Sequence, residues 1–137
     1  MSGYSKTPLA KKLGIKPASN VKLVNAPGHY PDLFTDLPDD LNINKSKKGR
    51  YQFVHFFTTD PAELASMLPK LRDDMVQDGI IWVSWPKKSA KTGSLVTENM
   101  VRDTGLNAGL VDIKVCAVDE VWSGLKFVIP VKDRKPK

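Results

Sequence analysis

The sequence predicts an α/β protein built on an open, mostly parallel sheet of about six strands. Two apolar segments rich in Val, Ile, Phe and Trp, residues 52–58 and 79–85, lack the polar alternation of half-exposed strands, which is typical of central parallel strands. The segment between them has helical periodicity. The three segments therefore predict a strand, a crossover helix and a second parallel strand, the unit from which open α/β sheets are built.

The crossover helix has a well-marked start. Asp60 is a suitable N-cap, Pro61 has the backbone angle favoured at the first helical position, and Glu63 stands at the N3 position of a capping box. Pro69 lacks the N–H of an internal helical hydrogen bond, so we expect a kink or a break there. Asp78-Gly79 predicts a left-handed exit. The apolar face of the helix consists of Leu64, Leu68, Leu71 and Met75.

The chain before this unit continues the alternation of helices and strands. We expect a short helix over residues 8–13 that Gly14 stops, a strand over 21–25, a short helix over about 31–37 and a weak strand over 41–44.

The chain after this unit predicts one more helix and two strands. Ser94 is a suitable N-cap for a helix that ends near Gly105, followed by a strand over 112–118 and a hairpin return over 125–129. Right-handed crossovers then place the strands, numbered along the chain, in the order 2-1-3-4-6-5, with the last strand antiparallel.

Length and charge indicate one domain. Of the 137 residues 41% are hydrophobic, enough for a core, and we expect one α/β domain over residues 8–131 between a disordered tail, 1–7, and a basic tail, 132–137. The net charge is +6, but residues 1–16 contribute +4 and residues 132–137 contribute +3, which leaves −1 for the rest. A nearly neutral core does not by itself indicate a nucleic-acid-binding protein.

The sequence predicts a soluble, cytoplasmic protein without contact to a membrane. No apolar run approaches the ~20 residues that span a bilayer, and the polar segment 1–6 leads into no signal peptide. The single cysteine, Cys116, cannot form an internal disulfide. Because it lies in an apolar run, we expect a small core residue rather than a nucleophile.

Two parts of the chain resemble a known enzyme class. Leu13-Gly-Ile-Lys-Pro17 with Val21-Lys-Leu-Val-Asn25 resembles the entry to the first strand of class I S-adenosylmethionine-dependent methyltransferases, and the run from Gly79 to Val83 with the terminal hairpin resembles their later strands. The resemblance implies a Rossmann-like fold. The chain departs from that class at the cofactor positions, where Asn25-Ala-Pro-Gly28 replaces a glycine-rich turn and Asn44-Lys45 replaces an acidic residue. A strand–helix unit between the second and third strands is also missing, so we expect a degenerate form of this fold and assign no cofactor.

The chain as a whole is similar to a small bacterial family classed as a domain of unknown function. The most recognisable stretches are residues 9–16, 83–89 and 115–127. The similarity extends over nearly the full length, and it implies the same fold without indicating an activity.

The predicted strand order locates a candidate site. In open α/β sheets ligands bind beyond the carboxyl ends of the strands, where the winding reverses. This places a crevice between residues 25–30 and 58–60, with 84–88 as the neighbouring wall. The candidate ligand-binding residues are Asn25, Gly28, His29, Tyr30, Thr59, Trp85, Lys87, Lys88, Asp119, Trp122 and Lys126.

Basic residues gather after two of the strands. Residues 45–50 contain four of them, and Lys87, Lys88 and Lys91 follow the fourth strand. If both groups lie at the carboxyl edge, they form a positive rim that can hold a phosphate or carboxylate. Solvated loop lysines are the alternative, which we favour for residues 45–50.

Aromatic and acidic residues near strand ends leave alternatives open. Trp85 and Trp122 either cover the sheet, which we favour, or stack on a ligand, whereas Trp82 is assigned to the core. Asp119 and Glu120 can accept hydrogen bonds from a ligand hydroxyl or form ion pairs with Lys126 or Lys88.

The two histidines differ in their surroundings. His29 follows the first strand and is a candidate acid or base, although a turn residue is the simpler interpretation. His55 lies within an apolar strand, so we expect it to be buried and hydrogen-bonded. The sequence has no metal-ligand spacing, P-loop or nucleophile motif.

Three functional hypotheses follow. The first is a non-enzymatic binding or interaction module whose crevice takes an anionic small molecule or a protein partner. The second is a minimal enzyme acting on an anionic or nucleotide-like small molecule, with His29 as acid or base and Lys87, Lys88 or Asp119 orienting the substrate. The third is weak nucleic-acid binding, without sequence specificity, through the basic loops and tails.

Overall fold

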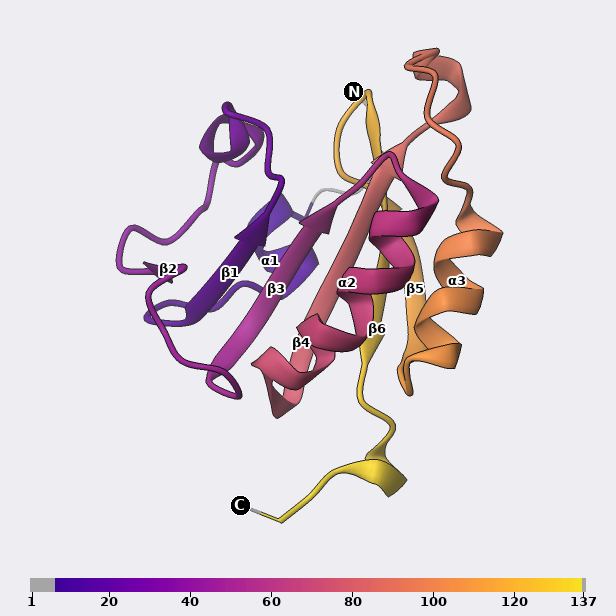
Figure 1. Cartoon of the computed structure of the whole chain (residues 1–137). Coiled ribbons are helices and arrows are strands. Elements are labelled where there is room, and N and C mark those ends of the chain that lie inside the picture. Colours follow the sequence, from indigo (N-terminus) through magenta and orange to yellow (C-terminus); the bar gives the residue numbers. More distant parts are fainter. Residues whose placement is uncertain (1–6, 137) are drawn as a thin grey trace.

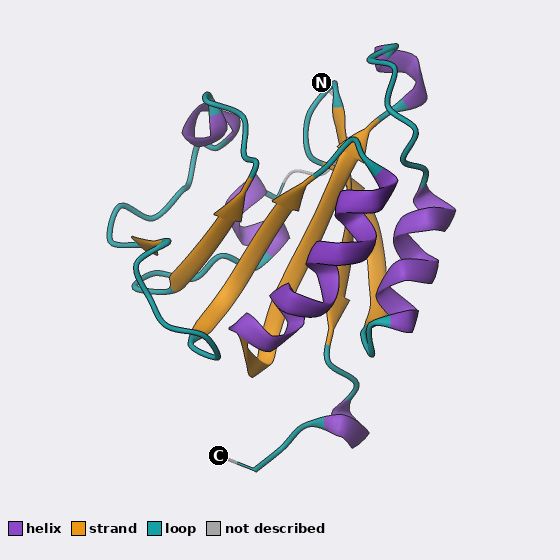
Figure 2. Ribbon diagram, viewed as in Figure 1, coloured by secondary structure: helices purple, strands orange, loops and turns teal. Residues whose placement is uncertain are grey.

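A six-stranded sheet forms the centre of the computed structural model, which describes residues 7–136 (Figures 1 and 2). Across the sheet the strands follow the order β2 (Asn42–Ile43), β1 (Asn20–Val24), β3 (Tyr51–Phe57), β4 (Met75–Pro86), β6 (Trp122–Val128) and β5 (Val111–Ala117). The first four of these are parallel, and β6 is antiparallel to both of its neighbours. This confirms the predicted fold class, strand order and antiparallel last strand.

Helices cover both faces of the sheet. Figure 1 shows α2 (Pro61–Asp74) and α3 (Glu98–Asn107) on one face and the short α1 (Leu9–Leu13) on the other. The larger core lies under α2 and α3 and includes Leu68, Val101 and Phe127. A smaller core lies under α1, where Trp82 is fully buried and its indole N–H donates to the carbonyl of Leu13 at 2.7 Å.

The crossover helix α2 begins as predicted and ends earlier. The Asp60 carboxylate accepts from the Ala62 N–H at 3.0 Å, which confirms the N-cap. The helix runs unbroken through Pro69, so the predicted break is wrong; Pro69 is on the exposed side, where water can bond the freed carbonyl. The chain enters β4 directly at Met75.

The predicted left-handed exit at Asp78-Gly79 is therefore also wrong. Gly79 is a buried residue of β4, beside the register irregularity at the start of the β3–β4 pairing. A Cβ at this position would lie 3.1–3.3 Å from the carbonyl oxygens of Val76, Tyr51 and Gln52. The glycine thus permits close approach of backbones rather than a turn.

Two other helix boundaries differ from the prediction. The helix α3 starts after Thr97, whose hydroxyl accepts from the Met100 N–H at 3.3 Å, while the Ser94 hydroxyl accepts from the Val96 N–H. The short helix expected over 31–37 is a single 3₁₀ turn, Tyr30–Leu33. Serine and threonine are both good caps, so the sequence pattern does not distinguish Ser94 from Thr97. Further 3₁₀ turns are Lys88–Ala90 and Val131–Asp133.

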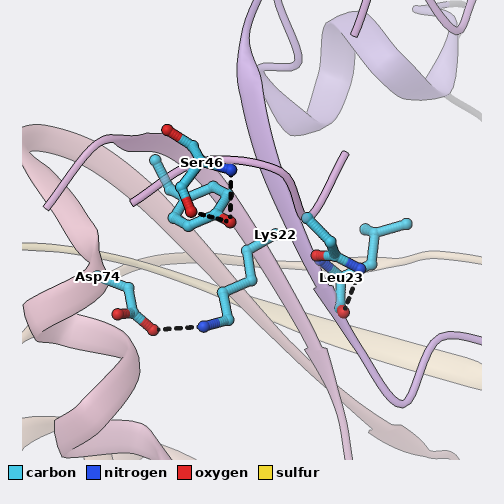
Figure 3. A network of polar contacts seen from close by, with 6 residues as sticks. Lys22, Leu23, Ser46 and Asp74 are labelled. Atoms are coloured by element: carbon cyan, nitrogen blue, oxygen red, sulfur yellow. Dashed lines mark hydrogen bonds and ion pairs between the residues drawn. The ribbon is translucent and has the colours of Figure 1, made fainter. Parts of the chain in front are cut away.

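The edge of the sheet at β1 and β2 is held by polar contacts (Figure 3). Lys22 of β1 forms an ion pair of 2.7 Å with Asp74 at the end of α2 and lies over the ring of Tyr51. The Asn44 side chain accepts from the Leu23 N–H at 2.8 Å and donates to the Leu23 carbonyl at 3.3 Å. Asn44 thus continues the pairing of the two-residue strand β2.

The described part of the C-terminal tail lies against the domain at the amino edge of the parallel strands. The Arg134 side chain donates to the carbonyl of Ile129, and the Lys135 N–H donates to the Gln77 side chain at 2.9 Å. The predicted N-terminal tail falls almost wholly outside the described residues. No helix in the described range 7–136 has the length and apolar character needed to cross a membrane.

Candidate ligand-binding crevice

A crevice of about 430 Å³ lies at the carboxyl edge of the sheet, where the sequence places a site. Its wall comes from the end of β1, the end of β3 and the first turn of α2, with the start of β6 opposite. It is lined by Asn25, Phe57, Thr58, Thr59, Asp60, Glu63 and Trp122. The volume is within the range of small-molecule sites.

The Glu63 carboxylate joins the two strands that form the crevice. Its Oε1 accepts from the Asn25 side chain at 3.0 Å and from the Thr58 hydroxyl at 2.8 Å. Asn25 also donates to the carbonyl of Phe57, and its backbone has a left-handed φ of 57°. Glu63 does not complete the predicted capping box, because the Asp60 N–H donates to the Thr58 hydroxyl instead.

An aromatic wall faces these polar groups. Trp122 is half-buried at the start of β6, and its ring contacts that of Phe57 edge to face at 5.0 Å between centroids. The Asp119 carboxylate holds the turn before Trp122 by accepting from the backbone N–H groups of Val121 and Trp122. The crevice therefore presents an indole ring together with carboxylate and hydroxyl groups.

Beneath the crevice lies a buried hydrogen-bonded chain. His55 Nδ1 is 2.9 Å from the Tyr30 hydroxyl, and Nε2 is 2.8 Å from the Ser84 hydroxyl. Burial lowers the pKa of His55 to about 3 and raises the pKa of Tyr30. Both side chains are therefore neutral near pH 7, and they join the loop after β1 to β3 and β4. This confirms the prediction for His55.

A second hollow of about 250 Å³ lies at the same edge, between the end of β4 and the start of α3. Trp85, Lys87 and Lys88 contribute to its lining. The Lys87 ammonium donates to the carbonyl of Asp119 at 2.7 Å, which leaves two of its N–H groups for another acceptor. The positive end of α3 faces the same hollow through Thr97 and Glu98.

The structure places the predicted site residues in different surroundings. Asn25, Thr59 and Trp122 line the crevice, and Trp85, Lys87 and Lys88 line the second hollow. The remaining predicted residues lie elsewhere. Gly28 and His29 are exposed and belong to neither lining, Tyr30 is buried, Asp119 holds its own turn, and Lys126 lies opposite Trp82 on the sheet.

Two lining residues fall outside the predicted crevice segments 25–30 and 58–60 and the candidate residues, Phe57 and Glu63. Their place at the end of a strand and in the first turn of the next helix is the signal that could have identified them. Lys48 and Arg50 line a hollow at the opposite edge, so the expected positive rim does not form. The loop 44–50 contains no helix and returns directly to the start of β3, which moves these residues away from the carboxyl edge.

That hollow at the amino edge is larger, about 860 Å³. Cationic and anionic side chains alternate around it, among them Arg50, Arg72, Asp73 and Asp78. We give more weight to the smaller crevice, because the carboxyl edge is where open parallel sheets bind ligands and because its polar groups converge. Within residues 7–136 no group of three His, Cys, Asp or Glu side chains is arranged to hold a metal ion.

Comparison with models of known protein families gives no match, and no curated protein matches the sequence. Solved structures do match. A SAM-dependent methyltransferase from Aquifex aeolicus superimposes with a TM-score of 0.68 at 15% identity, over 88% of this chain and 87% of that one. The 1,6-didemethyltoxoflavin-N1-methyltransferase of Burkholderia thailandensis gives 0.59 at 11% identity, over 87% and 73%. The cyclase SpnF gives 0.64 at 8% identity, over 90% and 78%.

The chain therefore has the Rossmann-like fold of class I S-adenosylmethionine-dependent methyltransferases. At these identities the similarity shows the fold alone, and one of the three matched proteins is named for a cyclisation rather than for methyl transfer.

Proposed function

We propose that this protein is a small binding module that retains the methyltransferase-like fold without the usual cofactor binding or catalysis. Its ligand is a small molecule with a ring that stacks on Trp122, hydroxyl or amino groups that donate to the crevice, and an anionic group that reaches Lys87 and Lys88. A nucleotide has all three features. The observation that carries the proposal is that the half-buried Trp122 and the Glu63 carboxylate line the same crevice.

The free acceptors of the crevice support this ligand class. The bonds described above use Oδ1 of Asp60 and Oε1 of Glu63, so the second oxygen of each carboxylate is available to a donor on a ligand. Two carboxylates disfavour an anion in the crevice itself. The anionic group is therefore assigned to the adjacent hollow, where Lys88 is exposed.

Two departures from a methyltransferase site support a degenerate form. The turn after β1, Asn25-Ala-Pro-Gly28, has a single glycine, and Pro27 has no N–H to donate to a cofactor. Asn44, at the end of β2, is bonded to the backbone of Leu23 and offers no carboxylate to a ribose.

The roles of the crevice carboxylates favour binding over catalysis. Asp60 caps α2, and Glu63 holds Asn25 and Thr58 in place. Both carboxylates therefore already serve as hydrogen-bond acceptors that hold the crevice together, which is a positioning role. His29, the acid or base of the alternative enzyme hypothesis, lines neither hollow.

The proposal is tested by a thermal-shift screen with nucleosides, nucleotides, S-adenosylmethionine, S-adenosylhomocysteine and phosphorylated metabolites. A ligand at a hundredfold over its dissociation constant adds roughly 2.7 kcal/mol to the free energy of unfolding, which is a shift of several degrees. Trp122→Ala is expected to abolish the shift. Lys88→Gln is expected to weaken the binding of nucleotides and to leave the binding of nucleosides unchanged.

Lys91→Gln is the matched control for Lys88→Gln, because Lys91 is also exposed and does not line the hollow. Equal effects of the two lysine variants, or a ligand shift that survives Trp122→Ala, would contradict the proposed site. A product released from S-adenosylmethionine in the presence of an acceptor would contradict the non-enzymatic role.

A further inference from the structure

The face of the sheet that carries α1 holds an unusual arrangement of cations on its antiparallel half. Lys126 lies on β6, an interior strand, directly opposite Trp82 of β4 on one side and Lys114 of β5 on the other. Side chains directly opposite one another on antiparallel strands point to the same face about 5 Å apart at Cβ. The two lysine side chains therefore start side by side on the same face of the sheet.

Like charges in directly opposed positions destabilise a sheet unless another group compensates them. Within residues 7–136, the ion pairs involve Lys22 and Arg102 and neither of these two lysines. Asp112, close by on β5, faces α3 and pairs with Arg102. The Asp36 carboxylate accepts hydrogen bonds from the backbone N–H groups of Ala10 and Lys11 on α1, and it forms no ion pair with either lysine.

A third cation faces the same area. Cys116 lies two positions beyond Lys114 on β5 and packs against the core under α1. Ala10 and Leu13 of α1 belong to the same core, and the charges of both Lys12, on α1, and Lys114 act on the Cys116 thiol. Burial lowers the pKa of Lys126, and the charge of Lys114 lowers it further. The interior lysine is thus partly desolvated among other cations.

We propose that Lys126, Lys114 and Lys12 form a binding site for a phosphate-type oxyanion on the α1 face of the β5–β6 hairpin. The anion accepts hydrogen bonds from the ammonium groups of Lys126 and Lys114 and removes their mutual repulsion. Lys114 by itself has another explanation, because a charged side chain on an edge strand such as β5 prevents pairing with other chains. That explanation does not extend to Lys126, which lies on an interior strand. This site is separate from the carboxyl-edge crevice and does not depend on the function proposed for it.

The test is a titration of the ¹⁵N-labelled protein with sodium phosphate, against sodium chloride at the same ionic strength, followed by amide NMR spectra. Phosphate-specific shifts are expected on β5, β6 and α1. Lys126→Gln is expected to weaken phosphate binding roughly tenfold, the loss of a charge-assisted hydrogen bond. The control is Lys70→Gln, which replaces an exposed lysine of α2 on the other face of the sheet. This variant is expected to bind phosphate like the unmodified protein.

Thermal unfolding gives a second readout that a merely structural lysine would not produce. In chloride, Lys126→Gln and Lys114→Gln are expected to unfold at the same temperature as the unmodified protein or above it, because repulsion is relieved. In phosphate at about ten times the dissociation constant, the unmodified protein is expected to gain about 4 °C and the variants much less. Phosphate-dependent NMR shifts confined to the region of Lys87 and Lys88 would overturn the proposal. So would Lys126→Gln and Lys114→Gln proteins that respond to phosphate as Lys70→Gln does.

Discussion

His55 is a neutral imidazole in the interior, and this makes the stability of the protein depend on pH. The pKa of this residue is about 3 in the folded protein, against 6.5 for an ordinary histidine. Between these values the unfolded chain binds more protons, so the free energy of unfolding decreases as the pH falls. The expected loss is about 1 kcal/mol per pH unit from near pH 6.5 downward, and the stabilisation is complete above that pH.

Urea unfolding at pH 7 and pH 4.5 measures this dependence. His55→Gln removes the buried imidazole and is expected to flatten the difference between the two pH values, while costing stability at both because Tyr30 or Ser84 loses a partner. His29→Gln, at an exposed position, is expected to keep the slope of the unmodified protein. Equal slopes in all three proteins would contradict this role of His55.

Single residues were predictable where the strand pattern determines burial. His55 lies in an uninterrupted apolar run, so its burial and need for hydrogen bonds could be predicted. Its partners could not be predicted, since Tyr30 and Ser84 are 25 and 29 residues away. The role of Glu63 was missed for a similar reason. Its position suggests a local cap, but Thr58 competes for the same N–H.

At the scale of elements, α3 packs on the sheet through Gly105. A Cβ at this position would be 2.1 Å from Cε1 of Phe127, which is fully buried. Gly105→Ala is therefore expected to destabilise the protein by about 1–3 kcal/mol, although alanine favours a helix by up to about 1 kcal/mol over glycine. Urea unfolding at neutral pH measures the change.

Gly28→Ala is the control for this prediction. Gly28 has no atom within 4 Å of an added Cβ and no left-handed φ, so the substitution is expected to change the free energy of unfolding by less than about 0.5 kcal/mol. A Gly105→Ala protein as stable as Gly28→Ala would show that α3 shifts easily on the sheet.

The sequence predicts the existence and type of the elements better than their ends. The pattern of Leu64, Leu68 and Leu71 determines α2, and these residues are buried as expected. Its end was misplaced because β4 is longer than its apolar run: Met75 already pairs with Tyr51, and the regular pairing resumes at Ile80 after an irregularity. The break predicted at Pro69 does not occur, because on the exposed face of α2 water can bond the carbonyl that the proline leaves free.

At the scale of the whole molecule, the positive charge resides in the terminal segments and a loop. The rest of the chain carries a net charge of −5, so any binding to duplex DNA is expected to be weak and independent of sequence. Fluorescence anisotropy with two unrelated duplexes is expected to give equal affinities that fall steeply between about 50 and 200 mM salt. Replacing Lys45, Lys47 and Lys48 by Gln is expected to reduce the salt dependence.

Unequal affinities for the two duplexes, or binding that persists at about 200 mM salt, would contradict a purely electrostatic contact. Replacement of exposed Lys70 by Gln is the control for a general loss of charge.

The topology was predictable because few arrangements of a strand–helix alternation with right-handed crossovers exist. The location of the crevice follows from the topology. Its chemistry does not, because the path of each loop decides which side chains reach it. The loop 44–50 takes Lys48 and Arg50 to the amino edge, and Asp60 and Glu63 give the crevice a negative lining.

The anchored C-terminal segment has a practical consequence for experiments on this protein. The Lys135 N–H donates to the Gln77 side chain, and Figure 1 shows the described C-terminal segment, up to residue 136, at the side of the sheet away from the tips of the parallel strands. A biotin or affinity handle added after residue 137 would therefore attach the molecule to a sensor surface with its crevice turned toward solution. Surface-based ligand screens can use this orientation directly, whereas coupling through random lysines would modify Lys87 and Lys88.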